Sequence, residues 1–80
     1  MKIKIFTVES CGKCPRAIKN IREANKELKA YAKIKVIEDP AEAVAHGFMS
    51  VPGIEIDEKV MSEGESISYE RAKEIIKEAM

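Results

Sequence analysis

The sequence has no excess of charge of either sign and no long apolar run, and each shortage excludes a class of protein. Acidic and basic residues balance at 14 each, so no basic surface predicts binding to nucleic acid or to an anionic membrane. No apolar run approaches the ~20 residues that span a bilayer. The start, Met1-Lys2-Ile3-Lys4, alternates and does not form the apolar block of a secretory signal. We therefore expect a soluble, cytoplasmic protein with no nucleic-acid or membrane partner.

Cysteine is also scarce, with 2 in a chain of 80 residues, which is too few for a disulfide-stabilised scaffold. Both lie in Cys11-Gly12-Lys13-Cys14, and a bridge across so short a loop would restrict the unfolded chain little. A cysteine pair at catalytic spacing, with no other cysteine, suits a reducing compartment. The length allows one hydrophobic core, so we expect a single domain over residues 1–80.

Hydrophobic periodicity predicts alternating strands and helices. Apolar residues alternate over about residues 2–8, and from Cys14 to Leu28 they recur at helical spacing opposite a charged face. Asp39-Pro40-Ala41-Glu42 predicts a short second helix with Asp39 as its N-cap and an end near Gly47. The other predicted elements are a strand at 34–37, a hairpin with strands at 51–56 and 60–63 around Asp57-Glu58, and a C-terminal helix from Ser68 that buries Ala72, Ile75, Ile76, Ala79 and Met80.

The order βαβαββα predicts an α/β fold. The first strand–helix–strand span is long enough for a right-handed parallel crossover, and the hairpin adds two antiparallel strands. We expect a mixed four-stranded sheet with helices on its faces. The turn at Asp57-Glu58 lacks an Asn-Gly or Asp-Gly signal, so its type and the register of the last strand stay open.

The Cys11-Gly12-Lys13-Cys14 motif falls where the first strand passes into a helix, and this placement is typical of a redox-active dithiol. Helical residues i and i+3 have Cα atoms about 5 Å apart, within the range that a disulfide requires. The helix N-terminus favours an anion. We expect Cys11 to be the attacking thiolate, with its sulfur accepting from the Cys14 N–H, and Cys14, one turn inside the helix, to be the resolving thiol.

The residues inside the motif tune this chemistry. Lys13 adds a cation between the cysteines, worth at most about 2.4 kcal/mol at ~7 Å, whereas Glu9 opposes it, and Gly12 is the other residue between the two thiols. The alternative is a metal half-site. Zinc takes four ligands, and His46 with scattered carboxylates are the only further candidates in one chain. We expect no metal site, although a four-thiolate site shared across a dimer stays open.

Ser50-Val51-Pro52-Gly53 opens the predicted third strand. Proline within a sheet is confined to an edge, a bulge or the first strand residue. A cis Val51–Pro52 bond would explain its position, but only about 5–6% of such bonds are cis in folded proteins. Local sequence therefore favours trans.

The order of elements, the dithiol motif and the Val51-Pro52 segment before a hairpin together resemble the thioredoxin/glutaredoxin superfamily. The resemblance covers essentially the whole chain and is closest to small prokaryotic thioredoxin-like redox-active disulfide proteins. It implies the sheet order 2-1-3-4, a cis Pro52 beside the dithiol, and a Val51 backbone that binds an extended substrate segment. It also implies a monomeric oxidoreductase in electron transport and cell redox homeostasis. Such an enzyme takes electrons from a reductase such as thioredoxin reductase, reduces protein disulfides, and needs no cofactor beyond the reversible Cys11–Cys14 disulfide.

The sequence departs from this pattern at several positions. Ser10 stands where typical thioredoxins have Trp, and Gly12-Lys13 lacks the aromatic residue of glutaredoxins. The acidic segment Glu63-Gly64-Glu65-Ser66 lacks the Gly-Gly pattern of their second glutathione-contacting segment, which argues against glutathione. Only Glu9 lies near the motif in sequence, so the proton acceptor for Cys14 stays open.

A second hypothesis is a redox-sensing adaptor or a dithiol metal-binding module without turnover. For His46, we expect a solvated cap at the end of the second helix. Phe48 and Met49 either form an apolar rim around the dithiol or close the core beneath that helix.

Overall fold

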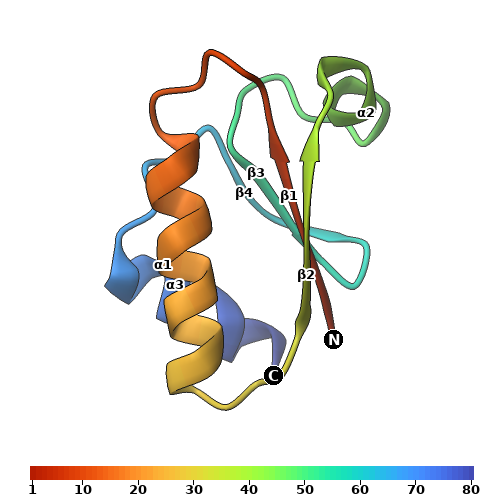
Figure 1. The fold of residues 1–80 in the computed structure, drawn as a ribbon. Helices are drawn as coiled ribbons and strands as arrows, with labels where there is room; N and C mark the ends of the chain where they lie inside the picture. The colour runs from red at the N-terminus through yellow and green to blue at the C-terminus, as the bar shows by residue number, and fades with distance from the viewer.

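The computed structural model describes residues 1–80 and arranges them as three helices around one sheet (Figure 1). The sheet order is β2-β1-β3-β4, with β1 and β2 parallel and the other neighbours antiparallel. The predicted α/β fold and its sheet order are confirmed. In chain order the elements are β1 (Lys2–Thr7), α1 (Cys14–Glu27), β2 (Lys33–Glu38), α2 (Pro40–Ala45), β3 (Gly53–Ile56), β4 (Lys59–Glu63) and α3 (Tyr69–Ala79).

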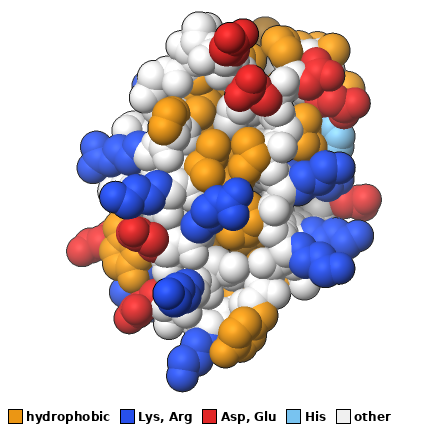
Figure 2. All heavy atoms as spheres, in the orientation of Figure 1, with side chains coloured by type: hydrophobic (Ala, Val, Ile, Leu, Met, Phe, Trp, Pro, Cys, Tyr) orange, Lys and Arg blue, Asp and Glu red, His pale blue; other side chains and the backbone are white.

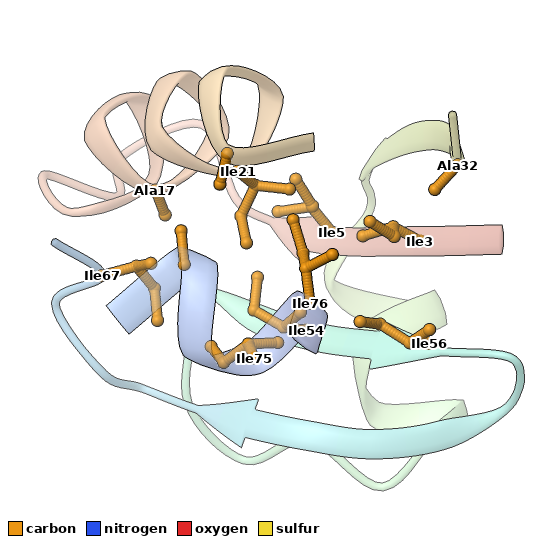
Figure 3. Close-up of a cluster of buried hydrophobic side chains, with 12 residues drawn as sticks. Ile3, Ile5, Ala17, Ile21, Ala32, Ile54, Ile56, Ile67, Ile75 and Ile76 are labelled. Carbon is orange, nitrogen blue, oxygen red and sulfur yellow. The ribbon is translucent and has the colours of Figure 1, made fainter. Parts of the chain in front are cut away.

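Helices α1 and α3 cover one face of the sheet, and α2 covers part of the other (Figure 1). Successive strand residues point to opposite faces, so the alternating isoleucines of β1 and β3 all meet α1 and α3. A smaller cluster of Phe6, Ala43 and Phe48 lies beneath α2. The larger cluster, drawn in Figure 3, includes Ile3, Ile5, Ile54 and Ile56 from the sheet, Ala17 and Ile21 from α1, and Ile75 and Ile76 from α3.

The buried face of α1 follows the predicted spacing with one addition. Cys14, Ala17, Ile21 and Ala24 are buried as expected, and so is Asn20. The Asn20 side chain donates to the Ile67 carbonyl across 2.8 Å, which satisfies a polar pair that burial would otherwise penalise. This bond ties α1 to the segment that enters α3.

The predicted cap at Asp39 forms, and Ser68, predicted only as the start of the last helix, also caps it. Asp39 Oδ1 accepts from the Ala41 N–H at 2.9 Å, and Ser68 Oγ accepts from the Arg71 N–H at 3.1 Å. Gly47 follows α2 with φ of +87°, a conformation that glycine adopts without a steric penalty. The three signals fix the start and end of α2 and the start of α3.

The hairpin between β3 and β4 has a two-residue turn with positive φ at both central positions, 48° at Asp57 and 68° at Glu58. Both signs match a type I′ turn, which suits strand twist. The pairing register shifts between Ile54 and Glu55. Ser62 pairs with Ile54 and Val60 with Glu55, so Met61 between them has no partner in β3. Val60 is exposed and Met61 is half-buried.

Several strand boundaries differ from the predictions by one or two residues. β2 extends one residue further at each end, over Lys33–Glu38, and β4 begins one residue earlier, at Lys59. β3 begins at Gly53, since Pro52 has no N–H for the ladder. The expected burial of Met80 is wrong: 65% of it is exposed, because α3 ends at Ala79 and Met80 lies beyond its last turn. None of the three helices has the length and apolar character to cross a membrane.

A charged group joins the end of β4 to α3. Glu65 accepts from Arg71 Nε and from Ser62 Oγ, both at 2.7 Å, and Arg71 also contacts Glu74 at 3.1 Å. The hydrogen bond from Arg71 is the main cause that lowers the pKa of Glu65; burial opposes it and Ser62 adds to it. The same pairing raises the pKa of Arg71.

The lowered pKa of Glu65 predicts a pH-dependent contribution to stability. An ionised Glu65 stabilises the fold above its unfolded-state pKa, and this contribution is lost as the pH falls through the lower folded-state pKa. We expect Glu65→Gln to reduce the free energy of unfolding near neutral pH by at most about 1 kcal/mol, since the pair is partly exposed. Urea unfolding should show this difference disappearing once the pH has fallen below the folded-state pKa of Glu65. The exposed Glu78→Gln is the control, and a Glu65→Gln deficit that persists in acid would contradict the assignment.

Candidate active site

The two cysteines lie between the end of β1 and the first residue of α1. They are joined by a disulfide, with Cα atoms 5.5 Å apart. This spacing falls within the range that a disulfide requires. Cys11 is half-buried, whereas Cys14 is only 3% exposed. An incoming substrate can therefore reach the Cys11 sulfur more readily than the Cys14 sulfur.

The backbone around the disulfide favours negative charge on Cys11. The Cys14 N–H donates to Cys11 Sγ across 3.1 Å, as the sequence predicts, and the Cys11 N–H donates to the Val8 carbonyl at 3.1 Å. Free N–H groups and the positive end of the helix dipole stabilise an anion at this point. A thiolate on Cys11 would accept the same Cys14 N–H after reduction.

The expected depth of Cys14 within the helix is wrong. α1 begins at Cys14, with Lys13 as its N-cap residue, because the Lys13 carbonyl accepts the first helical hydrogen bond, from the Ala17 N–H at 3.2 Å. Cys11 thus belongs to the loop before the helix. The shielding of Cys14 comes from packing against the core and not from a full turn of helix above it.

The two residues between the cysteines differ in their surroundings. Lys13 Nζ donates to the Gly64 carbonyl at 3.2 Å, so its charge is held against the loop after β4. Gly12 is exposed, and an added Cβ there would meet nothing within 4 Å. Of the pair, Lys13 is the one whose side chain has a defined place in the site.

The Val51–Pro52 peptide bond is cis, as the family resemblance implied and contrary to the trans form that local sequence favoured. Pro52 is fully buried and Val51 half-buried. The Pro52 carbonyl accepts from the Gly64 N–H at 2.9 Å. Because the Gly64 carbonyl in turn accepts from Lys13, the dithiol loop and the Pro52 loop meet at one residue.

Phe48 and Met49, expected either to close the core beneath α2 or to form an apolar rim, differ in their burial. Phe48 is buried against Phe6 and Ala43, whereas Met49 is 92% exposed. Phe48 lies over Gly53, where an added Cβ would be 2.6 Å from its ring. Met49 lines an apolar groove of about 160 Å³ beside Val51, together with Val8 and Val44. The first closes the core, and the second contributes to the surface next to the site.

Glu55 and His46 form a pair that sequence reasoning missed. Glu55, in β3, is 4% exposed, and its Oε2 lies 3.1 Å from His46 Nδ1. The His46 ring also packs on Phe6, with ring centroids 4.7 Å apart. His46 does end α2, as expected, but it is half-buried rather than solvated; its ring is visible at one edge of the face in Figure 2.

Strand alternation places Glu55 on the α2 face, opposite Ile54 and Ile56, and so on the far side of the sheet from α1 and Cys14. The only sequence signal was one acidic residue inside an apolar strand. No group of three or more His, Cys, Asp or Glu side chains is gathered to hold a metal ion.

Comparison with known proteins identifies relatives over most of the chain. A family model described as a thioredoxin domain matches residues 1–77. A thioredoxin of Methanothermobacter thermautotrophicus is 33% identical over 76 residues, which cover 95% of this chain and 97% of that protein. A probable thioredoxin of Methanothermobacter marburgensis is 38% identical over 60 residues, or 71% of each chain.

A solved structure shares the fold. It is titled "Structure of a malarial protein", and it matches with a TM-score of 0.73 over 96% of this chain and 93% of its own. At 13% identity this likeness concerns the arrangement of helices and strands alone.

The contact between Gly53 and Phe48 makes a prediction about stability. Gly53→Ala places a methyl group 2.6 Å from a ring that is itself buried, so we expect a loss of about 1–3 kcal/mol in the free energy of unfolding. Gly12→Ala, in open space, is the control and should change stability by less than about 0.5 kcal/mol. Urea unfolding of the oxidised proteins measures both, and equal stabilities would show that Phe48 moves aside freely.

Proposed function

The chain belongs to the thioredoxin family of thiol–disulfide oxidoreductases, and we propose that it reduces disulfides of protein substrates, with Cys11 as the nucleophile and Cys14 as the resolving thiol. The observation that carries the proposal is the asymmetry of the pair. Cys11 is the more exposed sulfur and lies at a helix N-terminus, where it accepts from the Cys14 N–H. Cys14 is buried behind it.

The reaction follows from this asymmetry. The Cys11 thiolate attacks one sulfur of the substrate disulfide, a Cys11–substrate bond forms, and the other substrate sulfur leaves as a thiolate. Cys14, after losing its proton, then attacks Cys11 Sγ, which breaks the mixed disulfide and releases the second substrate thiol. Two electrons pass to the substrate, and the Cys11–Cys14 disulfide remains, the state that the structure contains.

The segment before Pro52 supplies the surface for an extended substrate. Val51 immediately precedes the cis proline, and the groove beside it has Val8, Val44 and Met49 in its walls. A substrate segment could pair with the Val51 backbone as an added strand while its cysteine lies over Cys11. Lys13 and Gly12 tune the dithiol, Lys13 by its charge, which the Gly64 carbonyl holds in place.

The same proposal extends to partners and location. Substrates are disulfide-containing proteins, and a reductase such as thioredoxin reductase restores the dithiol. No cofactor is needed beyond the reversible disulfide, because both electrons are carried by the two sulfurs. We place the protein as a monomer in the cytoplasm, contributing to electron transport and redox homeostasis, without nucleic-acid or membrane partners. Glutathione is not its expected substrate, since the segment from Glu63 to Ser66 is acidic.

Trapping of the mixed disulfide tests the assigned roles. Cys14→Ser removes the resolving thiol, so the reduced variant should accumulate a covalent adduct with a protein disulfide such as insulin, visible by mass spectrometry without reductant. Cys11→Ser is the matched control and should give no comparable adduct, because its remaining thiol is buried. Adducts formed equally by both variants would overturn the assignment of roles. A wild type that binds stoichiometric zinc and never turns over would favour a metal-binding module.

A further inference from the structure

Glu63 is the last residue of β4, and its carboxylate lies against the segment that leads into Pro52. Its Oε2 accepts from two successive backbone donors, the N–H of Met49 and, at 3.2 Å, the N–H of Ser50. Carboxylates are strong acceptors for backbone N–H groups. Glu63 thus holds two residues of a loop that lies between α2 and β3.

The next residue, Gly64, contacts the same loop. Its N–H donates to the Pro52 carbonyl at 2.9 Å, and its φ of +67° is in the left-handed region. An added Cβ at Gly64 would lie 2.7 Å from Ser50 Cβ, so only glycine allows this approach. Backbone and side-chain contacts from two adjacent residues therefore fix the chain on both sides of Val51.

The dithiol loop is tied to this same point. Lys13 Nζ donates to the Gly64 carbonyl at 3.2 Å. Glu63-Gly64 therefore connects the loop that carries the two cysteines with the loop that carries Val51. The pairing of β1 with β3 brings the two loops to the same end of the sheet, and this connection adds a direct contact between them.

A carboxylate is well suited to hold this loop. Met49 is 92% exposed and Ser50 is exposed, so little apolar burial keeps these residues in place. Ordering a loop costs backbone conformational entropy, and an acceptor shared by two N–H groups offsets part of that cost. Without it, the residues before Val51 would sample more conformations in the free protein.

We propose that Glu63 is a positioning residue for substrate capture: it holds Met49 and Ser50 so that the Val51 backbone is presented to an extended polypeptide disulfide. This inference rests on the proposed function. Glu63 acts through Met49 and Ser50 and does not contact the reacting sulfurs. Its removal should therefore impair polypeptide substrates and spare small disulfides that need no strand pairing.

The test compares two substrates. For Glu63→Ala we expect KM for insulin disulfides to rise roughly tenfold, the scale of one hydrogen bond to a charged group. Its rate with 5,5′-dithiobis(2-nitrobenzoic acid), a small aromatic disulfide, should equal that of the wild type. Glu63→Gln keeps an acceptor oxygen of the same shape without the charge, so its KM for insulin should fall between those of the wild type and Glu63→Ala. It also guards against misfolding of the alanine variant.

Glu78→Gln is the matched control, because it removes the same charge from an exposed position on α3. It should change neither KM for insulin nor the rate with the small disulfide. Amide hydrogen exchange gives a direct readout: the N–H groups of Met49 and Ser50 should exchange faster in both Glu63 variants and at the wild-type rate in Glu78→Gln. A merely stabilising role would slow both substrates alike.

The outcomes separate this proposal from the proposed function. A wild type that reduces neither disulfide would overturn the oxidoreductase itself and, with it, the role of Glu63. A wild type that reduces both, with Glu63 variants that match it on insulin, would overturn only the positioning role. Equal losses on the two substrates would also overturn it, as would unchanged exchange at Met49 and Ser50.

Discussion

A hydrogen bond from the Cys14 N–H to Cys11 Sγ stands at the centre of this small structure. It forms because β1 ends and α1 begins within a few residues, with the two sulfurs at the helix N-terminus. The donor is a backbone group, so the stabilisation that it would offer a Cys11 thiolate does not depend on any neighbouring side chain. The asymmetry between an accessible Cys11 and a shielded Cys14 follows from the same geometry.

The rest of the fold holds that junction in place. α1 is anchored by Ala17 and Ile21 in the isoleucine core and by Asn20 on the Ile67 carbonyl. The antiparallel pairing of β1 with β3 brings Gly53, and therefore Pro52, to the end of the sheet where the cysteines lie. The pairing of β1 with β3 and the anchoring of α1 thus bring the two parts of the site together in a chain of 80 residues.

Local signals in the sequence predicted most of these elements. Isoleucine alternation, the helical spacing of α1, the cap at Asp39 and the start of α3 near Ser68 depend on neighbours within a few residues, and each is confirmed. The charged contacts were not predictable in this way. The Glu63 carboxylate accepts from Met49 and Ser50, which precede it by 14 and 13 positions in the chain. His46 meets Glu55 only after α2 folds onto the sheet. Periodicity carries no information about which polar side chains meet across such distances.

Ultraviolet thiolate absorbance against pH, measured on the reduced protein with Cys11→Ser and Cys14→Ser alongside, tests the central claim most directly. A free thiol ionises at about 8.5. Activation of Cys11 by the helix end predicts a transition well below that value, present in the wild type and in Cys14→Ser and absent from Cys11→Ser. Two ordinary thiols with interchangeable transitions would contradict the account, because the helix end would then not distinguish the two sulfurs.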